Sequence, residues 1–221
     1  HSPRPFHTWG QDLIGPLPMS RGKRYALVCI CHHSRTPKIL PLASKEAKLV
    51  AREFFHHVIL TTCIPAVIIT DRGGEFDNEL LAHIMKLLNI KHKMTAILHP
   101  ATNGKCERLN KFIKRALAIL VASHGKGWVD YTAPLAFAFY HAPLRDIGKT
   151  PFELCHGFPG RLPVDLLITP PEAIQLSSVR HHAAYVARLA STWQSARALE
   201  ADRETTLSRG ADESSSYTIF Q

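Results

Sequence analysis

Short runs of apolar residues recur through the first hundred positions of the chain. Residues 25–31 and 36–42 are rich in β-forming residues and flank a short turn, which predicts a pair of neighbouring strands. Residues 64–71 form an apolar run without alternation, as expected of a strand buried on both faces of its sheet. Residues 92–96 predict a last short strand, and Asp12 lies in the middle of another candidate strand near the N-terminus.

Apolar residues spaced three and four apart predict helices between and after these strands. Residues 44–62 place Val50, Phe54 and Val58 on one face, with Ser44 as the expected N-cap. Further helices are predicted over residues 78–90, 107–120, 128–142 and 181–207. The expected inward faces are Leu80, Ile84, Leu87 and Leu88 in the first of these, and Leu109, Phe112, Ile113, Ala116, Leu117 and Leu120 in the second.

The order of these elements predicts a layered α/β domain. Strands come first along the chain and then alternate with helices, an order typical of a mixed sheet flanked by helices. From residue 128 onward the pattern is helical, and the polar residues 208–221 are typical of a frayed, disordered tail.

The positive charge is concentrated in one half of the chain. Residues 1–125 hold 18 Lys and Arg against 8 Asp and Glu, a net of +10, whereas residues 126–221 hold 9 against 10, a net of −1. A polyanionic partner, usually nucleic acid, explains such an excess. A basic surface that serves only solubility explains it equally well, so that charge alone does not decide between the two.

Cysteine usage and hydropathy restrict the compartment. The five cysteines are odd in number and scattered, which indicates no disulfide framework. No apolar run is long enough to cross a bilayer, and residues 1–10 lack the apolar region of a signal peptide. We therefore expect an intracellular protein with no membrane partner.

A single acid, Glu107, lies among cations near the start of the helix at 107–120. The five cations around it are Lys105, Arg108, Lys111, Lys114 and Arg115. At about 100° per residue, Lys111 and Lys114 fall on the same exposed face as Glu107, one and two turns away. These spacings also suit ordinary Glu–Lys pairs worth a few tenths of a kcal/mol, and this helix alone favours that simpler interpretation.

Two further carboxylates change this interpretation. Asp71 ends a buried strand before a Gly-Gly turn, where a carboxylate needs a cation or hydrogen-bond donors; a turn-capping role is the alternative. Asp12 stands in mid-strand, where aspartate is disfavoured, and shares a side of the pleat with Gly10 and Ile14. If the helix that carries Glu107 packs on this sheet, the three carboxylates converge. Hard divalent cations such as Mg²⁺ bind oxygen ligands of this kind.

These residues, with the sequence around them, resemble the D,D-35-E motif of retroviral-type integrases. Asp12 lies in WGQDLIGPLP, Asp71 in TDRGGEF and Glu107 in HPATNGKCER, and 35 residues separate Asp71 from Glu107. The surrounding sequence is most similar to Gypsy-type long-terminal-repeat retrotransposons, including GKTPFELCHG at 148–157. The resemblance runs from about residue 5 to residue 158 and continues more faintly to about residue 207.

The resemblance implies an RNase H-like α/β fold: a mixed five-stranded sheet flanked by helices, with a C-terminal helical extension. It divides the chain into an N-terminal arm (1–5), an integrase catalytic core (6–158), a helical extension or linker (159–207) and the tail (208–221). Within these 221 residues we expect neither the family's His-His-Cys-Cys zinc domain nor its DNA-binding barrel.

A metal-dependent polynucleotidyl transferase is the activity that the resemblance implies. Asp12, Asp71 and Glu107 would be its catalytic and metal-binding residues, with two Mg²⁺ or Mn²⁺ ions. Two ions roughly 3.5–4 Å apart can activate the attacking oxygen and stabilise the leaving oxygen of an in-line displacement. The expected reactions are trimming of the element's DNA ends by water and joining of the freed 3′-hydroxyls to target DNA.

The resemblance further implies DNA contacts around the acid. Lys111 and Lys114 match family lysines that hold the DNA end, and Asn103 matches a polar residue of the mobile loop before the catalytic helix. We expect Arg108 and Arg115, on the flank of the same helix, to contact DNA as well.

The chain departs from the family pattern in two places. Residues 31–34 (CHHS) stand where the family has an acidic residue and an aromatic, and Tyr140–His141 stand near the position of a family asparagine; neither position is catalytic. The segment CICHH at 29–33 invites a zinc interpretation. No second ligand pair stands at finger spacing, so that a buried strand running into a turn is favoured.

Two other classes of function stay open. One is a catalytically idle, domesticated integrase that binds DNA or chromatin, which a metal-dependent activity assay would separate. The other is an RNase H-like nuclease acting on RNA–DNA hybrids, although that family carries four acids in a different order, which this sequence lacks. The expected partners are double-stranded DNA and further copies of the chain, as a homodimer or higher oligomer. The expected location is the nucleus or a retroelement particle.

Overall fold

The computed structural model describes residues 2–71, 73–74, 76, 79–94, 104–124, 127–163, 165, 191, 193–199 and 201, without the side chains of 80, 104–108 and 124. The chain divides into two compact units, His1–Tyr140 and His141–Gln221. None of the described helices combines the length and the apolar character that a membrane span requires.

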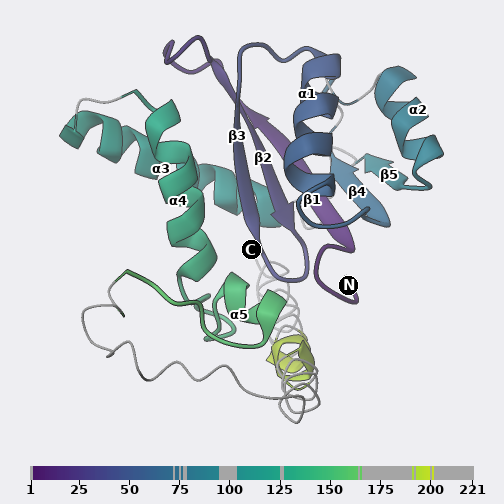
Figure 1. Cartoon of the computed structure of the whole chain (residues 1–221), viewed down its shortest axis with the longest axis vertical. Helices are drawn as coiled ribbons and strands as arrows, with labels where there is room; N and C mark the ends of the chain where they lie inside the picture. Colours follow the sequence, from purple (N-terminus) through teal and green to yellow (C-terminus); the bar gives the residue numbers. More distant parts are fainter. Residues whose placement is uncertain are drawn as a thin grey trace, which may run out of the picture. The chain divides into compact units, whose positions relative to one another are not determined.

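A mixed five-stranded sheet forms the centre of the first unit (Figure 1). Its strands are β1 (Thr8–Ile14), β2 (Tyr25–Cys31), β3 (Pro37–Leu42), β4 (Val67–Thr70) and β5 (Lys91–Met94). The spatial order is β3-β2-β1-β4-β5, in which β1, β2 and β3 pair antiparallel whereas β4 runs parallel to β1 and to β5. The predicted sheet is confirmed. Compared with the predicted strand at 64–71, β4 begins three residues later, since its pairing with β1 begins at Thr8 and Val67, and it ends one residue earlier.

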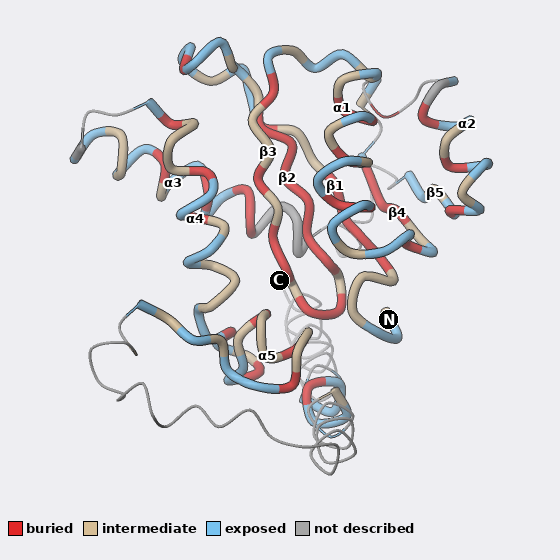
Figure 2. Tube along the Cα trace, in the orientation of Figure 1, coloured by how far each residue is buried: buried red, intermediate tan, exposed pale blue. Residues whose placement is uncertain are grey.

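Helices cover both faces of this sheet (Figure 1). The helices are α1 (Ala47–Phe54), which continues as a π-helix over Phe55–Ile59, α2 (Glu79–Leu87), α3 (Gly104–His124) and α4 (Val129–His141). Residues from α1 and α2 share one hydrophobic cluster with Trp9, Leu27 and Cys29 of the sheet. Residues from α3 and α4 share a second cluster with Ile14 and Val28 on the opposite face. Both faces of β1 and β2 are therefore buried (Figure 2).

Three details of the helices differ from the prediction. The N-cap of α1 is Glu46 rather than Ser44, because the helix begins only at Ala47. Leu87 is 76% exposed, since it ends α2 on the side away from the stripe of Leu81 and Met85 that meets the sheet. Phe112 is 45% exposed because its ring packs beside Phe139 of α4, at 5.6 Å between centroids, rather than under α3.

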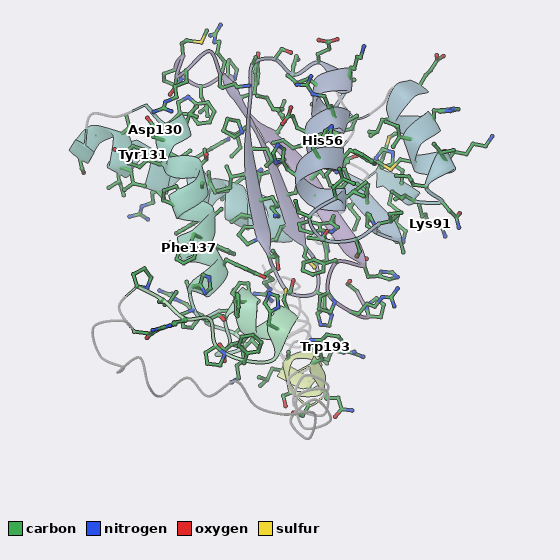
Figure 3. The ribbon with its side chains drawn as sticks, in the orientation of Figure 1. His56, Lys91, Asp130, Tyr131, Phe137 and Trp193 are labelled. Carbon is green, nitrogen blue, oxygen red and sulfur yellow. The ribbon has the colours of Figure 1, made fainter. Side chains whose placement is uncertain are left out.

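The second unit contains a short helix that sequence periodicity did not predict, α5 (Pro151–His156). Its signal is a capping box: the hydroxyl of Thr150 accepts from the Glu153 backbone N–H, and the Glu153 carboxylate accepts from the Thr150 N–H. The indole of Trp193, labelled in Figure 3, donates to the Leu154 carbonyl at 2.6 Å. Of the helix predicted over 181–207, residues 191, 193–199 and 201 are helical; the rest, with the tail, lie outside the described residues.

Candidate active site

Asp12 and Asp71 occupy neighbouring positions at the centre of the sheet. Gly10 of β1 pairs with Ile69 of β4, and the two strands are parallel. Two residues further along each strand direction, Asp12 therefore comes beside Asp71, which directly follows the end of β4. Neighbouring strands lie about 4.8 Å apart, and residues two apart share a face. The two carboxylates predicted to converge thus stand next to each other, on the face that α3 covers.

The carboxylate of Asp12 is half-buried and held by two donors. Its Oδ1 accepts from the backbone N–H of Leu13 at 2.8 Å, and its Oδ2 accepts a short hydrogen bond from the side-chain amide of Asn110 in α3. Burial raises the pKa of Asp12 above its ordinary value, and the negative charge of Asp71 raises it further. The two donors and the charge of Lys114 partly offset this rise.

Asp71 is exposed and makes the turn contact that the sequence allowed. Its Oδ1 accepts from the backbone N–H of Gly73 at 3.1 Å, so that the carboxylate does cap the turn after β4. Its charge nevertheless acts on Asp12. The Asp71 carboxylate therefore does both: it caps the turn after β4, and it lies close enough to Asp12 for the two charges to interact.

Asn110 is a site residue that the sequence pattern did not reveal. Asn110 is buried, at 7% exposed, although it is polar, and it lies on the same arc of α3 as Leu109 and Ile113. Its amide nitrogen donates to Asp12, while its Oδ1 is buried and has no partner among the described atoms. The available signal is a polar residue within the apolar arc of the helix, three residues after Glu107.

The structure describes only some of the other predicted site residues. The backbone of Glu107 belongs to α3, but its side chain, like that of Arg108 and the whole of Asn103, lies outside the described residues. Lys111, Lys114 and Arg115 are described and exposed on α3, and the Lys114 charge reaches Asp12. Within the described side chains, no cluster of three or more His, Cys, Asp or Glu could hold a metal ion. The role of Glu107 as third ligand therefore stays a prediction.

The donor set that is described suits a hard divalent cation. Two carboxylates stand side by side, one of them half-buried with its pKa raised by burial and by the other. The side-chain amide of Asn110, which donates to Asp12, also carries a buried Oδ1 with no partner among the described atoms. Oxygen donors of this type are those that Mg²⁺ and Mn²⁺ prefer, and a cation would relieve the repulsion between the two acids. The described residues therefore fit a divalent cation.

Cys29 and Cys31 take part in packing. Both are completely buried in the core beneath α1, at 0% exposed, and burial raises the pKa of the Cys29 thiol. The Cys31 sulfur accepts from the backbone N–H of Phe6 at 3.2 Å. The segment at 29–33 is thus the end of β2 running into a turn, as the sequence favoured over a zinc site.

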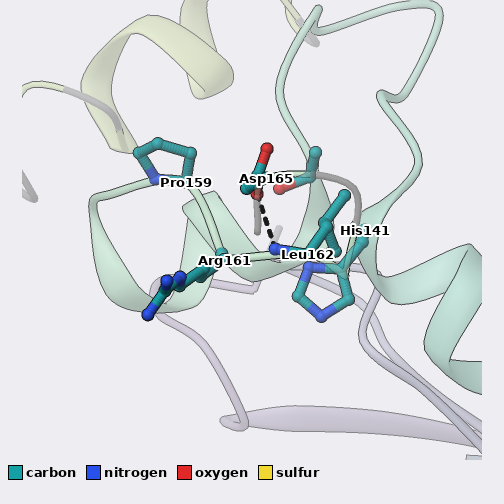
Figure 4. Close-up of a pocket in the computed structure, with 7 residues that line it drawn as sticks. His141, Pro159, Arg161, Leu162 and Asp165 are labelled. Carbon is teal, nitrogen blue, oxygen red and sulfur yellow. Dashed lines mark hydrogen bonds between the residues drawn. The ribbon is translucent and has the colours of Figure 1, made fainter. Parts of the chain in front are cut away.

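A cavity of about 640 Å³ lies within the second unit and contains none of the predicted site residues (Figure 4). A hydrogen bond of 2.6 Å from the Leu162 N–H to the Asp165 carboxylate shapes its wall. Its lining is His141, Thr150, Pro159, Gly160, Arg161, Leu162 and Asp165.

Comparison with known proteins finds similar sequences among retroviral and retrotransposon polyproteins. The chain is 29% identical over 153 residues to the retrovirus-related Pol polyprotein from transposon 412 of Drosophila melanogaster, covering 69% of this chain and 12% of the relative. It is 30% identical over 157 residues to the Gag-Pol polyprotein of feline leukemia virus, covering 71% and 9%. A Tf2-3 transposon polyprotein of Schizosaccharomyces pombe matches at 28% over 167 residues, covering 75% and 12%. The chain thus spans about a tenth of the length of these curated relatives.

Solved structures agree on the fold. The HTLV-2 integrase catalytic core domain in complex with magnesium superposes with a TM-score of 0.58 at 18% identity, covering 71% of this chain and all of that one. The chain is thus similar in sequence to retroviral and retrotransposon Pol polyproteins and in fold to retroviral integrase cores. The catalytic core domain of BIV integrase also matches this integrase-type fold, with a TM-score of 0.56 at 17% identity over 68% of this chain and 93% of that one. No protein-family model matches the sequence.

Proposed function

We propose that this chain is an integrase catalytic core that performs metal-dependent phosphodiester chemistry on DNA. The observation that carries the proposal is the pairing of β1 with β4, which sets Asp12 beside Asp71 under the cationic helix α3. The relationship to Pol polyproteins and the core fold of HTLV-2 and BIV integrases support the same reaction class. The proposed location is the nucleus or a retroelement particle.

Each residue of the site has a defined task in this proposal. Asp12, Asp71 and Glu107 would hold two Mg²⁺ or Mn²⁺ ions, which when bound supply Lewis-acid activation of the attacking oxygen and charge stabilisation at the leaving oxygen. Asn110 donates a hydrogen bond to one oxygen of Asp12 and so fixes the orientation of that carboxylate. Lys111 and Lys114, exposed on α3, would contact phosphates of the element end and align the scissile bond.

Cleavage of supercoiled plasmid with Mn²⁺ and with Mg²⁺ tests the proposed chemistry. Wild-type chain should nick the plasmid with either ion, and a chelator should stop the reaction. Binding without nicking would instead indicate a domesticated DNA-binding domain. Hydrolysis of an RNA–DNA hybrid without action on duplex DNA would identify an RNase H-like nuclease.

Metal binding should be measurable without DNA. Because a ligand that binds only the folded state stabilises it, Mg²⁺ at about ten times its Kd should add about 1.4 kcal/mol to the free energy of unfolding. For a chain of this length that corresponds to a rise in Tm of roughly 3–6 °C. Differential scanning fluorimetry should show this rise for wild type and not for Asp71→Asn. An equal rise in both proteins would place the metal elsewhere.

Phosphate contacts should appear in the salt dependence of DNA binding. If Lys111 and Lys114 each neutralise one phosphate, changing either to alanine should reduce the slope of log K against log[salt] by about 0.9. The loss of affinity should be similar for unrelated DNA sequences. Lys45→Ala is the matched control, since Lys45 is also exposed but precedes α1 on the other face of the sheet. Unchanged slopes in both lysine variants would instead favour ordinary Glu–Lys pairing on this helix face, without phosphate contacts.

We propose that a second copy of the chain binds at an exposed apolar groove. Lys48, Arg52, Phe55 and Leu87 are among the residues that line this groove between α1 and α2. The HTLV-2 core domain is known in a dimeric and a trimeric form. Changing Leu87 to glutamate should weaken self-association at least about tenfold in sedimentation equilibrium, whereas Ile64→Glu, at another exposed apolar position, should not. Equal self-association of Leu87→Glu and wild type would exclude the groove.

A further inference from the structure

The last residue of β4, Thr70, connects Asp71 to the edge strand β5. Thr70 is completely buried, and its hydroxyl oxygen lies 2.8 Å from the backbone carbonyl oxygen of Asp71. The same hydroxyl oxygen lies 2.9 Å from Nε2 of His92 in β5. Because side chains alternate along a strand, Thr70 and His92 occupy the face opposite to the Asp71 carboxylate. The contact therefore reaches Asp71 through its peptide and not through its side chain.

Counting hydrogens assigns a direction to both contacts. A threonine hydroxyl carries one hydrogen, and a carbonyl oxygen can only accept. If the hydroxyl donated to His92, two oxygens with no hydrogen between them would stand 2.8 Å apart, which is unfavourable in a buried site. The hydroxyl must therefore donate to the Asp71 carbonyl, and Nε2 of His92 must donate to the hydroxyl. His92 accordingly carries a hydrogen on Nε2.

We propose that His92 is a positioning residue for Asp71. Its Nε2–H directs the Thr70 hydroxyl onto the Asp71 carbonyl and so orients the peptide unit that follows Asp71 where the chain leaves β4. The Gly73 N–H holds the carboxylate from the other side of the same residue. This chain of contacts determines how the carboxylate is presented beside Asp12. The role as an aid to metal binding rests on the proposed function, whereas the hydrogen-bond direction does not.

The hydrogen-bond direction can be read without metal or DNA. In the full chain labelled with ¹⁵N-histidine, long-range ¹H–¹⁵N correlation distinguishes the two neutral tautomers, and comparison with His92→Gln identifies the His92 signal. We expect the tautomer with hydrogen on Nε2. The tautomer with hydrogen only on Nδ1 would overturn the proposal, because His92 would then accept from Thr70 and leave the Asp71 carbonyl without this donor.

The Mn²⁺ affinity, measured by water-proton relaxation without DNA, tests the positioning role of His92. Thr70→Val and His92→Leu should weaken Mn²⁺ binding by about tenfold, at the low end of the cost of disturbing a ligand's outer contacts. Thr70→Ser and His92→Gln keep a hydroxyl and an N–H donor and should restore most of the affinity. Thr132→Val is the matched control, since Thr132 is also buried and donates to a backbone carbonyl, that of Val129 in α4, away from the site.

The outcomes separate this inference from the proposed function. Wild-type affinity in Thr70→Val, or an equal loss in Thr132→Val, would overturn the positioning role. Absence of Mn²⁺ binding by wild type would instead contradict the proposed function. Two measurements would then still decide whether His92 orients this peptide. One is the His92 tautomer, and the other compares the backbone amide chemical shifts of residues 71–73 between Thr70→Val and Thr70→Ser.

Discussion

Changing Glu107 to glutamine is expected to abolish Mg²⁺-dependent nicking and joining of DNA while the chain stays folded. A metal ligand in such a site supports transition-state stabilisation of several kcal/mol, so that its loss should slow the reaction on the order of 10³-fold or more. Glutamine keeps the size of the side chain but removes the charge that a divalent cation requires. Circular dichroism and Tm without metal should match or slightly exceed wild type, because a negative charge is removed from a cluster of acids.

The matched control is Glu79→Gln at the start of α2, where an exposed glutamate is neutralised away from the predicted site. That variant should nick plasmid DNA at the wild-type rate. A Glu107→Gln protein with near wild-type activity would show that Glu107 is not the third acid, whatever the roles of Asp12 and Asp71.

Changing Asn110 to aspartate is expected to destabilise the metal-free chain strongly at neutral pH. The change replaces the donor to Asp12 by a third carboxylate in a buried position, next to an acid whose pKa is already raised by burial and by Asp71. Unpaired buried charge costs about 3 kcal/mol or more of unfolding free energy. Since the folded-state pKa of Asp12 lies above its unfolded value, the loss should be small in acid and grow as pH rises through this raised pKa.

Urea unfolding at about pH 4 and about pH 7.5 measures this dependence. Asn110→Ala controls for the lost hydrogen bond alone and should show a smaller, less pH-dependent loss. A destabilisation of Asn110→Asp that is the same at both pH values would show that charge repulsion from Asp12 is not its cause. Saturating Mg²⁺ should restore part of the lost stability, because the added acid would face a cation.

Much of the sheet can be predicted from local pattern. The strand at 25–31 appears with the predicted bounds because its residues are β-formers between clear turns, and Val50, Phe54 and Val58 are buried as their spacing indicates. The errors occur where tertiary packing decides. Leu87 and Ile64 are apolar but exposed, because nothing in their own segments tells which side the sheet will cover.

The sequence indicates which residues are candidates for the site but not the contacts between them. Motif spacing named Asp12, Asp71 and Glu107, and the structure places the first two side by side. The register of two parallel strands more than fifty residues apart in sequence is a tertiary property that no local pattern contains. For the same reason Asn110 was missed: its role depends on a contact with a residue 98 positions earlier.

A strand-transfer assay on the 221-residue chain tests directly whether it joins DNA ends in a metal-dependent reaction. A short duplex that mimics an element end with a recessed 3′-hydroxyl is incubated with Mg²⁺ and supercoiled plasmid, and covalently joined products are counted. We expect joined products for wild type, none after chelation, and none from Asp71→Asn or Asp12→Asn. Joined products from Asp71→Asn at the wild-type rate, or no phosphodiester chemistry by wild type in either Mg²⁺ or Mn²⁺ under conditions where DNA is bound, would contradict it.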